Sequence, residues 1–313
     1  MQNTSNTRPL IRGNNYTLRD IVNAYMAQFT GRDVNVTSRL RPFVETLGDC
    51  IAHEVDADQI QDVLDAVQAR GAMSCPGGRK PGTQAISLGR PLALTTLNRY
   101  RAAISAALSW GKRKRLFPKG WINPVTEVEQ HPENNARVRY LTTDEYTRLL
   151  AAARISAWPK LRVLIMMAVT TGARRGALLG LRWADVDLDN ARAYVERTKN
   201  GSSFVLVLLP EVVAELRKVK GKAADDDLVF CGRRPNTPAA FTSSWQTALK
   251  GARIEGACFH TLRHTHASWL AQQGAQLLEI AESMNHRSLS MTRRYAHLCV
   301  DNRATMLSRV FGG

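Results

Sequence analysis

Apolar residues recur at helical spacing in the first third of the chain. Residues 17–29 place them on one face, and Thr17 can cap the first turn of the resulting helix. The same pattern returns in residues 58–69 and in residues 95–110, the latter with an alanine-rich filling. The pattern predicts a helical bundle in this part of the chain.

The remainder of the chain mixes helical and strand patterns. Thr142 and Glu145 have the spacing of a capping box that opens a helix, and residues 161–169 are apolar enough for a buried helix. A three-stranded antiparallel sheet is predicted from short β-rich segments with turn signals between them, at residues 181–186, 193–195 and 204–208. Further helices are predicted at residues 212–219, 260–273 and 302–311.

The length of 313 residues exceeds the usual size of a single domain, so two domains are expected. Residues 127–139 are polar and lose periodicity, which is typical of a linker. We therefore expect an N-terminal tail at 1–15, a helical domain at 16–126 and a second domain at 140–313 that ends in a tail helix. The fold class is mainly α with a small antiparallel β-sheet.

The chain is strongly basic, with a formal net charge of +16. Such a charge favours a polyanionic partner, because neutralising nucleic-acid phosphates releases condensed counterions. Composition alone fits a ribosomal or membrane-surface protein about as well as a DNA- or RNA-binding protein.

Two basic segments are candidates for contact with phosphates. The glycine- and proline-rich residues 71–93 are long enough for a functional loop, although a surface insertion whose charges aid solubility has equal weight. The four cations at residues 112–115 favour phosphate contact over a solvated face, because they gather at one helix end. The candidate DNA-binding residues are Arg79, Lys80, Arg99, Lys112, Arg113, Lys114 and Arg115.

The five cysteines are scattered without the paired spacing that holds zinc or a redox centre, so we interpret them as reduced thiols. The N-terminus lacks the apolar core of a signal peptide. The longest apolar run, residues 163–169, is far shorter than the roughly 20 residues that span a bilayer. We expect a cytoplasmic protein without a membrane partner, associated with the nucleoid where DNA is its partner.

Residues suited to phosphate chemistry gather in the second half of the chain. Arg174 and Arg263 can each give two parallel hydrogen bonds to phosphate oxygens and keep their charge. His260 stands three residues before Arg263, so both face one side of a helix, and its imidazole can take a proton or bind the phosphate. His264 lies one residue further round, and we interpret it as a buried histidine that either supports neighbouring site residues or serves the structure of the helix.

Lys199 and Tyr295 are further candidates. Lys199 precedes a tight-turn signal, so we expect it at a hairpin tip, where its ammonium can protonate a leaving oxygen. Tyr295 follows two arginines in a segment short of apolar neighbours, which favours an exposed phenol. A phenol that attacks phosphate forms a covalent ester, and its usual pKa of about 10 means that cations or a base must help it to ionise.

Three ordered segments of the second half resemble the tyrosine recombinases, also called the phage integrase family. They are TTGARRGALLGLRWADVD around Arg174, HTLRH at residues 260–264 and SMNHRSLSMTRRYAHL around Tyr295. The N-terminal segment LTTLNRYRAAISAALSWGKRKRLFPKGWINPV is similar to the helical core-binding domain of that family. The resemblance covers the chain from about residue 16, and three motifs in order are far more specific than one.

The resemblance implies a two-domain clamp on DNA and a site-specific recombinase that works through a 3′-phosphotyrosine link. The implied catalytic residues are Arg174, Lys199, His260, Arg263, His286 and Tyr295. In this assignment Tyr295 attacks, while both arginines and His286 support the phosphate. His260 assists proton movement, and Lys199 protonates the 5′ hydroxyl.

The implied chemistry needs no cofactor, because the ester retains the energy of the broken bond and the arginines supply the charge that a metal would provide. The implied partners are double-stranded DNA at a specific core site and three further copies of the chain in a synaptic homotetramer. The tail helix is expected to pack on a neighbouring subunit or, with nearly equal weight, on its own domain. Because the first helical domain begins almost at once, we expect no separate arm-site DNA-binding domain.

Two positions depart from the family pattern. Ala177 stands where relatives often carry an acidic residue, three places after the first arginine, and Asn285 replaces the glycine that usually precedes the last histidine. The first departure can loosen Arg174 or Lys199. Two other functions remain open: a type IB topoisomerase, which would use the same ester as a monomer, and a non-catalytic DNA-binding regulator, which Ala177 supports.

Overall fold

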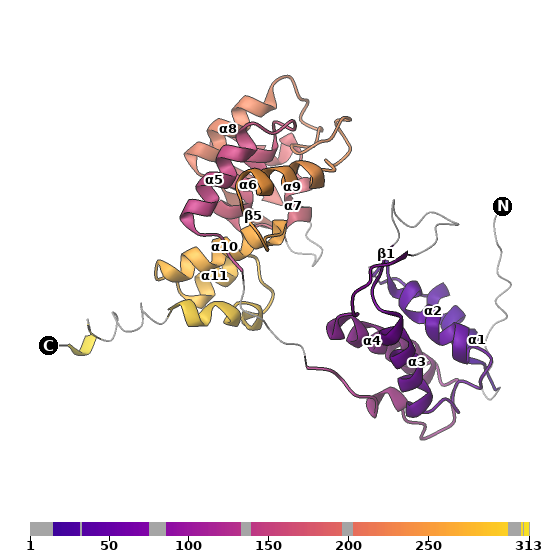
Figure 1. Cartoon of the computed structure of the whole chain (residues 1–313). Helices are drawn as coiled ribbons and strands as arrows, with labels where there is room; N and C mark the ends of the chain where they lie inside the picture. Colours follow the sequence, from indigo (N-terminus) through magenta and orange to yellow (C-terminus); the bar gives the residue numbers. More distant parts are fainter. Residues whose placement is uncertain are drawn as a thin grey trace. The chain divides into compact units, whose positions relative to one another are not determined.

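The chain divides into two compact units, Met1–Asn134 and Asn135–Gly313 (Figure 1). A computed structural model describes residues 15–31, 33–74, 86–132, 139–195, 203–299, 308 and 310–312. Each unit has its own buried apolar core. The predicted fold class, mainly helical with a small antiparallel sheet, is confirmed.

The first unit is a bundle of helices, as predicted. Its elements are α1 (Leu18–Ala27), α2 (Val36–Leu47), α3 (Ala57–Arg70), α4 (Leu94–Arg113) and the 3-10 turn η1 (Pro124–Thr126). Thr17 caps α1 in a capping box with Asp20, so the predicted cap is confirmed. Helix α2 was not predicted, because its first turns are largely polar and Pro42 interrupts the pattern that marks a helix.

A short hairpin follows α3, where we expected a loop. Strands β1 (Met73–Ser74) and β2 (Ile86–Ser87) pair antiparallel, with Met73 opposite Ser87. Two residues on each side are too few to give an alternating pattern in the sequence. Arg79 and Lys80 lie between the strands, outside the described residues.

The first unit continues beyond the boundary that we expected at the start of residues 127–139. Val128 is buried in the first core, and the Arg101 Nε donates to its carbonyl oxygen at 3.0 Å. The backbone N–H of His131 donates to Asn98 Oδ1 at 3.1 Å, and Asn98 Nδ2 donates to the His131 carbonyl at 2.8 Å. Side chains of α4 thus fix the first part of the expected linker to the bundle, and the division between the two units falls within residues 127–139.

The second unit surrounds a small sheet with helices. Its helices are α5 (Thr143–Arg154), α6 (Leu161–Thr171), α7 (Arg175–Leu179), α8 (Pro210–Lys220), α9 (Thr242–Gly251), α10 (Phe259–Gln272) and α11 (Leu277–Ser283). The 3-10 turns are η2 (Trp183–Asp185), η3 (Leu289–Met291) and η4 (Arg293–Cys299). Short helices such as α7 and α11 were not predicted, since one or two turns carry little periodic signal. The predicted tail helix at residues 302–311 falls mostly outside the described residues.

The sheet has the predicted antiparallel arrangement. Strands β3 (Val186–Asp187), β4 (Arg192–Val195) and β5 (Phe204–Val207) lie in the order β3-β4-β5. The strand predicted at residues 181–186 is wrong over most of its length. There the Asp185 carboxylate accepts a hydrogen bond from the Arg182 N–H at 2.9 Å, which closes the 3-10 turn η2 instead.

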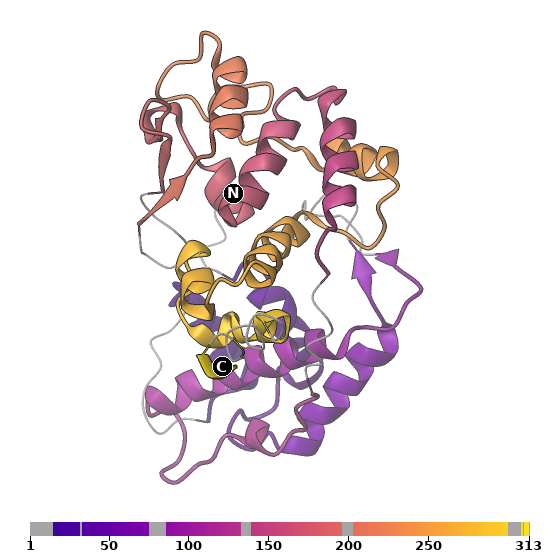
Figure 2. The same cartoon turned by 90° about the vertical axis from the view of Figure 1, so that its left-hand side faces the viewer.

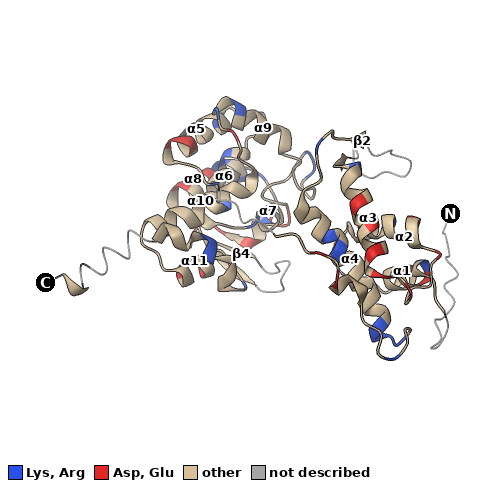
Figure 3. Cartoon of the chain, turned by 60° about the horizontal axis from the view of Figure 1, so that its bottom comes forward, with Lys and Arg blue, Asp and Glu red and all other residues tan. Residues whose placement is uncertain are grey.

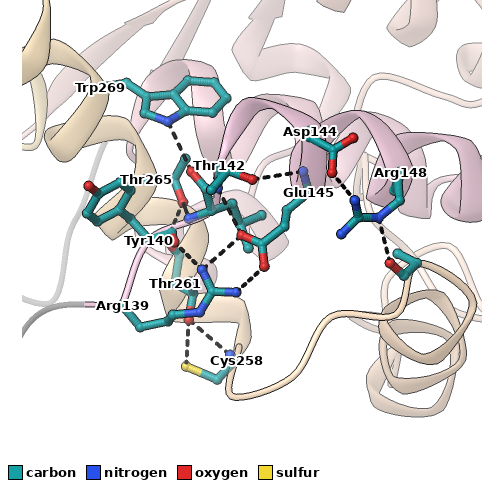
Figure 4. Close-up of polar contacts among 12 residues, drawn as sticks. Arg139, Tyr140, Thr142, Asp144, Glu145, Arg148, Cys258, Thr261, Thr265 and Trp269 are labelled. Atoms are coloured by element: carbon teal, nitrogen blue, oxygen red, sulfur yellow. Dashed lines mark hydrogen bonds and ion pairs between the residues drawn. The ribbon is translucent and has the colours of Figure 1, made fainter.

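Helix α10 lies at the centre of the second unit. It packs against α6 and also against η4, and Figures 1 and 2 show the yellow C-terminal elements gathered beside it. It also contacts the segment that leads into α5: the Leu141 N–H donates to Thr265 Oγ1 at 2.9 Å, and Trp269 Nε1 donates to the Leu141 carbonyl at 3.1 Å. Figure 4 shows Thr265 and Trp269 beside Thr142 at the start of α5. Glu145 completes the predicted capping box with Thr142. These contacts fix the helix that carries His260 and Arg263.

Candidate functional site

The turn after α6 places one of the two predicted arginines. Helix α6 ends at Gly172 in the left-handed conformation, with φ of 61°. A Cβ atom at this position would lie 2.5 Å from Cδ2 of His266, so glycine is required for the close approach as well as for the backbone angle. The turn presents the Gly172 carbonyl to Arg263 Nη1, which donates to it at 2.5 Å. Arg174 follows immediately, in extended backbone at the N-terminus of α7.

The two predicted arginines converge on the turn after α11. Arg263 Nη2 donates to the Met284 carbonyl at 2.8 Å, and Arg174 Nη1 donates to the Asn285 carbonyl at 3.3 Å. Because these carbonyls belong to consecutive residues, the two guanidinium groups lie side by side. Asn285 adopts a left-handed backbone with φ of 49°, a conformation that suits glycine and that asparagine tolerates better than most residues. The departure at this position is thus compatible with the turn.

The Arg263 side chain is buried, with 4% of the residue exposed. Burial, and then the nearby charge of Arg174, lower the pKa of Arg263 to about 10, so it stays protonated at neutral pH. Within the described part of the chain no carboxylate forms an ion pair with either arginine. Two adjacent cations without counter-charges favour binding of an anion such as phosphate.

Two predicted histidines lie within electrostatic range of both arginines. Burial, followed by the charges of Arg263 and Arg174, lowers the pKa of His260. The same causes in the same order lower the pKa of His286 to about 4. Both imidazoles are therefore neutral near pH 7, and each can accept or donate one hydrogen bond to a substrate. His286 Nδ1 lies 2.8 Å from Thr292 Oγ1, a contact that the sequence did not reveal.

Tyr295 is buried, so the expectation of an exposed phenol is wrong. Only 1% of the residue is exposed, and its ring belongs to a small apolar cluster with Ala267, Ala271, Ile280 and Met284. The error arose because these neighbours come from α10 and α11, whereas the sequence around Tyr295 is itself polar. Burial raises the pKa of Tyr295 against the opposing effect of two arginines, one of which is Arg263.

His264 contacts the phenol directly. Its Nδ1 atom lies 2.6 Å from the Tyr295 Oη. The His264 ring also meets the His260 ring edge-on, with 4.7 Å between centroids. The prediction of a buried supporting or structural histidine named neither contact, although the spacing of four residues from His260 was a signal that the two share a helix face.

The other predicted residues lie either outside the described residues or in the first unit. Lys199, like Arg79 and Lys80, lies outside the described residues. The remaining basic candidates belong to the first unit, where Lys and Arg mark α4 in blue (Figure 3). They are exposed on α4 or directly after it: Arg99, Lys112, Arg113, Lys114 and Arg115.

Ala177 lies in α7 beside a surface hollow of about 250 Å³ that Tyr194 and Val195 of β4 also line. Position 177 itself carries no acidic side chain, but the nearby Asp185 also lines the hollow. Across residues 15–31, 33–74, 86–132, 139–195 and 203–299, no group of three His, Cys, Asp or Glu side chains is arranged to hold a metal ion. None of the helices in these ranges has the length and hydropathy needed to cross a membrane.

The chain is similar to known proteins over much of its length. The sequence model described as the phage integrase family matches residues 139–301. The integrase of Salmonella phage P22 is 29% identical over 242 residues, which cover 71% of this chain and 60% of that protein. The shufflon-specific DNA recombinase of Escherichia coli is 30% identical over 216 residues, which cover 67% of this chain and 53% of that protein. The chain thus spans less than two thirds of the length of these relatives.

Solved structures with low sequence identity share the fold. The Tn1549 transposon integrase in complex with circular intermediate DNA gives a TM-score of 0.69 at 18% identity, covering 93% of this chain and 99% of that chain. A lambda integrase tetramer bound to a Holliday junction gives 0.66 at 19% identity, covering 91% of this chain and 78% of that chain. At such identities the likeness establishes the fold alone.

Proposed function

We propose that this chain, which belongs to the phage integrase family, is a site-specific DNA recombinase that cleaves and rejoins strands through a 3′-phosphotyrosine link. One observation carries the proposal: Arg174 and Arg263 donate to the carbonyls of two consecutive residues. The charges of both arginines also lower the pKa of His260 and of His286, so the four side chains lie close together. Tyr295, whose phenol carries the proposed nucleophile, lies close enough for its charge to affect the pKa of Arg263. The proposed catalytic set is completed by Lys199.

The proposed reaction follows from the charge requirements of phosphate. As the Tyr295 oxygen bonds to phosphorus, the phosphate becomes five-coordinate and accumulates negative charge that Arg174 and Arg263 can stabilise. The bond to the 5′ oxygen breaks, and Lys199 supplies a proton to that leaving oxygen, while His260 assists the loss of the phenol proton. The ester retains the free energy of the broken bond. Attack by a 5′ hydroxyl can therefore reseal a strand without ATP.

We assign DNA binding to the exposed cations of the first unit as well as to the arginine site. Lys112 and Arg113, in the last turn of α4, would meet phosphates in a two-domain clamp, and Arg99, Lys114 and Arg115 would bind further phosphates. The logarithm of the DNA-binding constant falls linearly as the logarithm of the salt concentration rises, and each phosphate contact that is lost should make this slope less steep by about 0.9. Replacing both Lys112 and Arg113 with Ala should make the slope less steep by about 2. The matched control removes two surface charges from α8, Arg217 and Lys218, and should leave the slope unchanged.

The proposed partner is double-stranded DNA with a specific core site, and the proposed synaptic assembly is a homotetramer. The lambda integrase tetramer on a Holliday junction supports this assembly by likeness of fold. Integration, excision, inversion and resolution share one strand-cleavage chemistry, so the proposal covers all four outcomes. We expect such a protein in the cytoplasm, associated with the nucleoid.

Adduct trapping tests the proposed reaction. Wild-type protein is incubated with a library of nicked suicide duplexes, and covalently bound DNA is recovered and sequenced. We expect adducts on one family of sequences, and Tyr295→Phe should abolish them while leaving duplex binding nearly intact. Adducts that persist in Tyr295→Phe would remove this residue from its assigned role.

The same experiment separates the alternatives. Relaxation of supercoiled plasmid without a defined site would indicate a topoisomerase. Tight duplex binding by the wild type without any adduct across the library would indicate a regulator.

A further inference from the structure

The proposed nucleophile occupies a position from which it cannot react. The Tyr295 residue is 1% exposed, and its ring packs against side chains of α10 and α11. A phosphate in a DNA backbone is charged and bulky, so it cannot enter an apolar cluster to reach a buried phenol. The phenol must therefore leave this position before it attacks, and whatever holds it there sets the free-energy cost of that movement.

The phenol makes a short hydrogen bond with a histidine that the proposed chemistry does not use. His264 Nδ1 lies 2.6 Å from Tyr295 Oη. His264 follows Arg263 directly on α10, and Arg263 is anchored through carbonyls of Gly172 and Met284. His264 therefore extends from a fixed helix, whereas Tyr295 lies in the 3-10 turn η4, whose hydrogen bonds have poorer geometry than those of an α-helix.

We propose that His264 is a positioning residue that holds the Tyr295 phenol in this buried, closed position and so limits its release. The inference rests on the proposed function in one respect only, that the phenol must be released before it attacks DNA. The holding contact itself is a property of the free protein. Burial in the small cluster supplies apolar packing, and the hydrogen bond to His264 fixes the hydroxyl.

A purely structural role would make a different prediction. If His264 served only to fill space in α10, its loss would loosen the second unit as a whole. If it holds the phenol, its loss would affect Tyr295 selectively. Tyr146 is a suitable reference, because it is half-buried in the larger core of the same unit, where its ring meets Trp269 edge-on at 5.4 Å.

Nitration of tyrosines in the free, full-length protein tests the proposal. The protein is treated briefly with tetranitromethane, and the peptides that contain Tyr295 and Tyr146 are quantified by mass spectrometry. A typical buried hydrogen bond stabilises by an amount that corresponds to a factor of about 2 to 10 in an equilibrium constant. We expect His264→Ala to accelerate nitration of Tyr295 by about that factor, with nitration of Tyr146 unchanged.

The conservative variant is His264→Asn, whose amide nitrogen occupies nearly the place of the imidazole Nδ1 and can keep the bond to the phenol. It should nitrate at Tyr295 close to the wild-type rate. Unchanged nitration of Tyr295 in His264→Ala would overturn the proposal. Equal acceleration of Tyr295 and Tyr146 would overturn it also, because it would indicate general loosening.

A thermodynamic cycle provides a second measurement that does not depend on nitration. His264→Ala is introduced into the wild type and into Tyr295→Phe, which lacks the hydroxyl but keeps the ring. The decrease in thermal stability should be smaller in the Tyr295→Phe background, and equal decreases in the two backgrounds would contradict a holding bond. Neither measurement contains DNA. A failure of the holding contact therefore leaves the recombinase proposal intact, and failed adduct trapping leaves these results valid.

Discussion

The two buried clusters of the second unit differ in size, and each holds a different part of the proposed site. The larger cluster includes α5, α6, α8, α9 and the first turn of α10, and it fixes the helix end and the turn from which Arg263 and Arg174 extend. The smaller cluster contains the buried residues Ala267, Ala271, Ile280, Met284 and Tyr295. The two arginines thus extend from elements of the larger cluster, although their guanidinium groups also donate to the carbonyls of Met284 and Asn285 after α11, and the proposed nucleophile is part of the smaller cluster.

This difference separates what must be rigid from what must move. Cations that stabilise a transition state act best when they are already in place, because no reorganisation is then needed during the reaction. A nucleophile that is buried in the free protein must instead be released. Local opening requires less free energy where fewer apolar contacts are broken. We therefore expect η4 to open while the arginines keep their positions.

The largest expected effect concerns the arginines, the part of the site that we expect to stay rigid. Arg263→Ala should slow single-turnover adduct formation on saturating DNA by a factor on the order of 100 to 1,000, the cost of removing a transition-state donor. It also leaves the Gly172 carbonyl without the hydrogen bond that it accepts at 2.5 Å. Arg287→Ala, at an exposed position near the same turn, is the matched control and should cleave normally. A near-normal rate in Arg263→Ala would refute the assignment of this arginine to the phosphate.

Matched cavities in the two clusters test whether the smaller one opens alone. Leu262 and Ile280 are both fully buried, the former in the larger cluster and the latter in the smaller. Leu262→Ala should lower the free energy of unfolding by about 2 to 5 kcal/mol, as measured by urea denaturation. Ile280→Ala should cost less in global unfolding, because the smaller cluster can relax, but it should accelerate amide hydrogen exchange in η4. Equal changes in the amide hydrogen exchange of η4 in both variants would contradict the expectation that the smaller cluster opens alone.

Acidification provides a smaller effect that acts where the clusters meet. Burial is the largest cause that lowers the pKa of His264, His266 and His286, each to about 4. Their unfolded values lie near 6.5, so the folded protein binds fewer protons between these values. The stabilising contribution of the neutral imidazoles is therefore complete above about pH 6.5 and is lost as the pH falls toward about 4.

His266 makes the most specific test of this pH dependence. Its Nδ1 lies 2.8 Å from the Val169 carbonyl, and its Nε2 lies 2.7 Å from Ser283 Oγ, so it joins α6 to α11. Each pKa unit corresponds to about 1.4 kcal/mol for a buried group and to less for the half-buried His264 and His286. The measurement is the urea midpoint between about pH 7 and about pH 4.5. His266→Gln should flatten this dependence, and an unchanged slope would exclude His266 as a contributor.

Local sequence signals predicted the elements that carry the site. Thr17 and Thr142 cap their helices as expected, since a capping box needs only four residues of context. The helix with His260 and Arg263 was predicted within one residue at each end. The three-stranded order of the sheet was also predicted, because each strand follows the last along the chain.

The geometry of the site depends on features that no local pattern records. Arg174 and Arg263 are placed by backbone carbonyls, which have no signature in the sequence. The burial of Tyr295 depends on apolar side chains of α10, of α11 and of the residue after α11, more than ten residues before it, whose spacing looks like ordinary helix packing. Contacts between elements, rather than the elements themselves, decided these outcomes.

The smallest predicted effect concerns Thr292, which contacts both His286 and the backbone of Tyr295. Thr292 is fully buried, its Oγ1 lies 2.8 Å from His286 Nδ1, and its carbonyl accepts the Tyr295 N–H at 2.9 Å. The hydroxyl therefore orients the imidazole that we propose to support the phosphate, and it lies directly before η4, which carries the proposed nucleophile. Thr292→Val keeps the shape and removes the hydroxyl, which should cost about 0.5 to 1.5 kcal/mol, or a factor of about 2 to 10 in adduct formation.

Thr292→Ser separates orientation from packing, because serine keeps the hydroxyl and lacks only a methyl group. It should cleave faster than Thr292→Val at saturating DNA, although the missing methyl group lowers its thermal stability. Duplex affinity should be nearly equal in both variants, since an oriented His286 acts on the reacting phosphate more than on the bound duplex. Serine and valine variants with the same cleavage rate would show that the hydroxyl does not orient His286, and Thr292 would then act only through packing beneath the η4 turn.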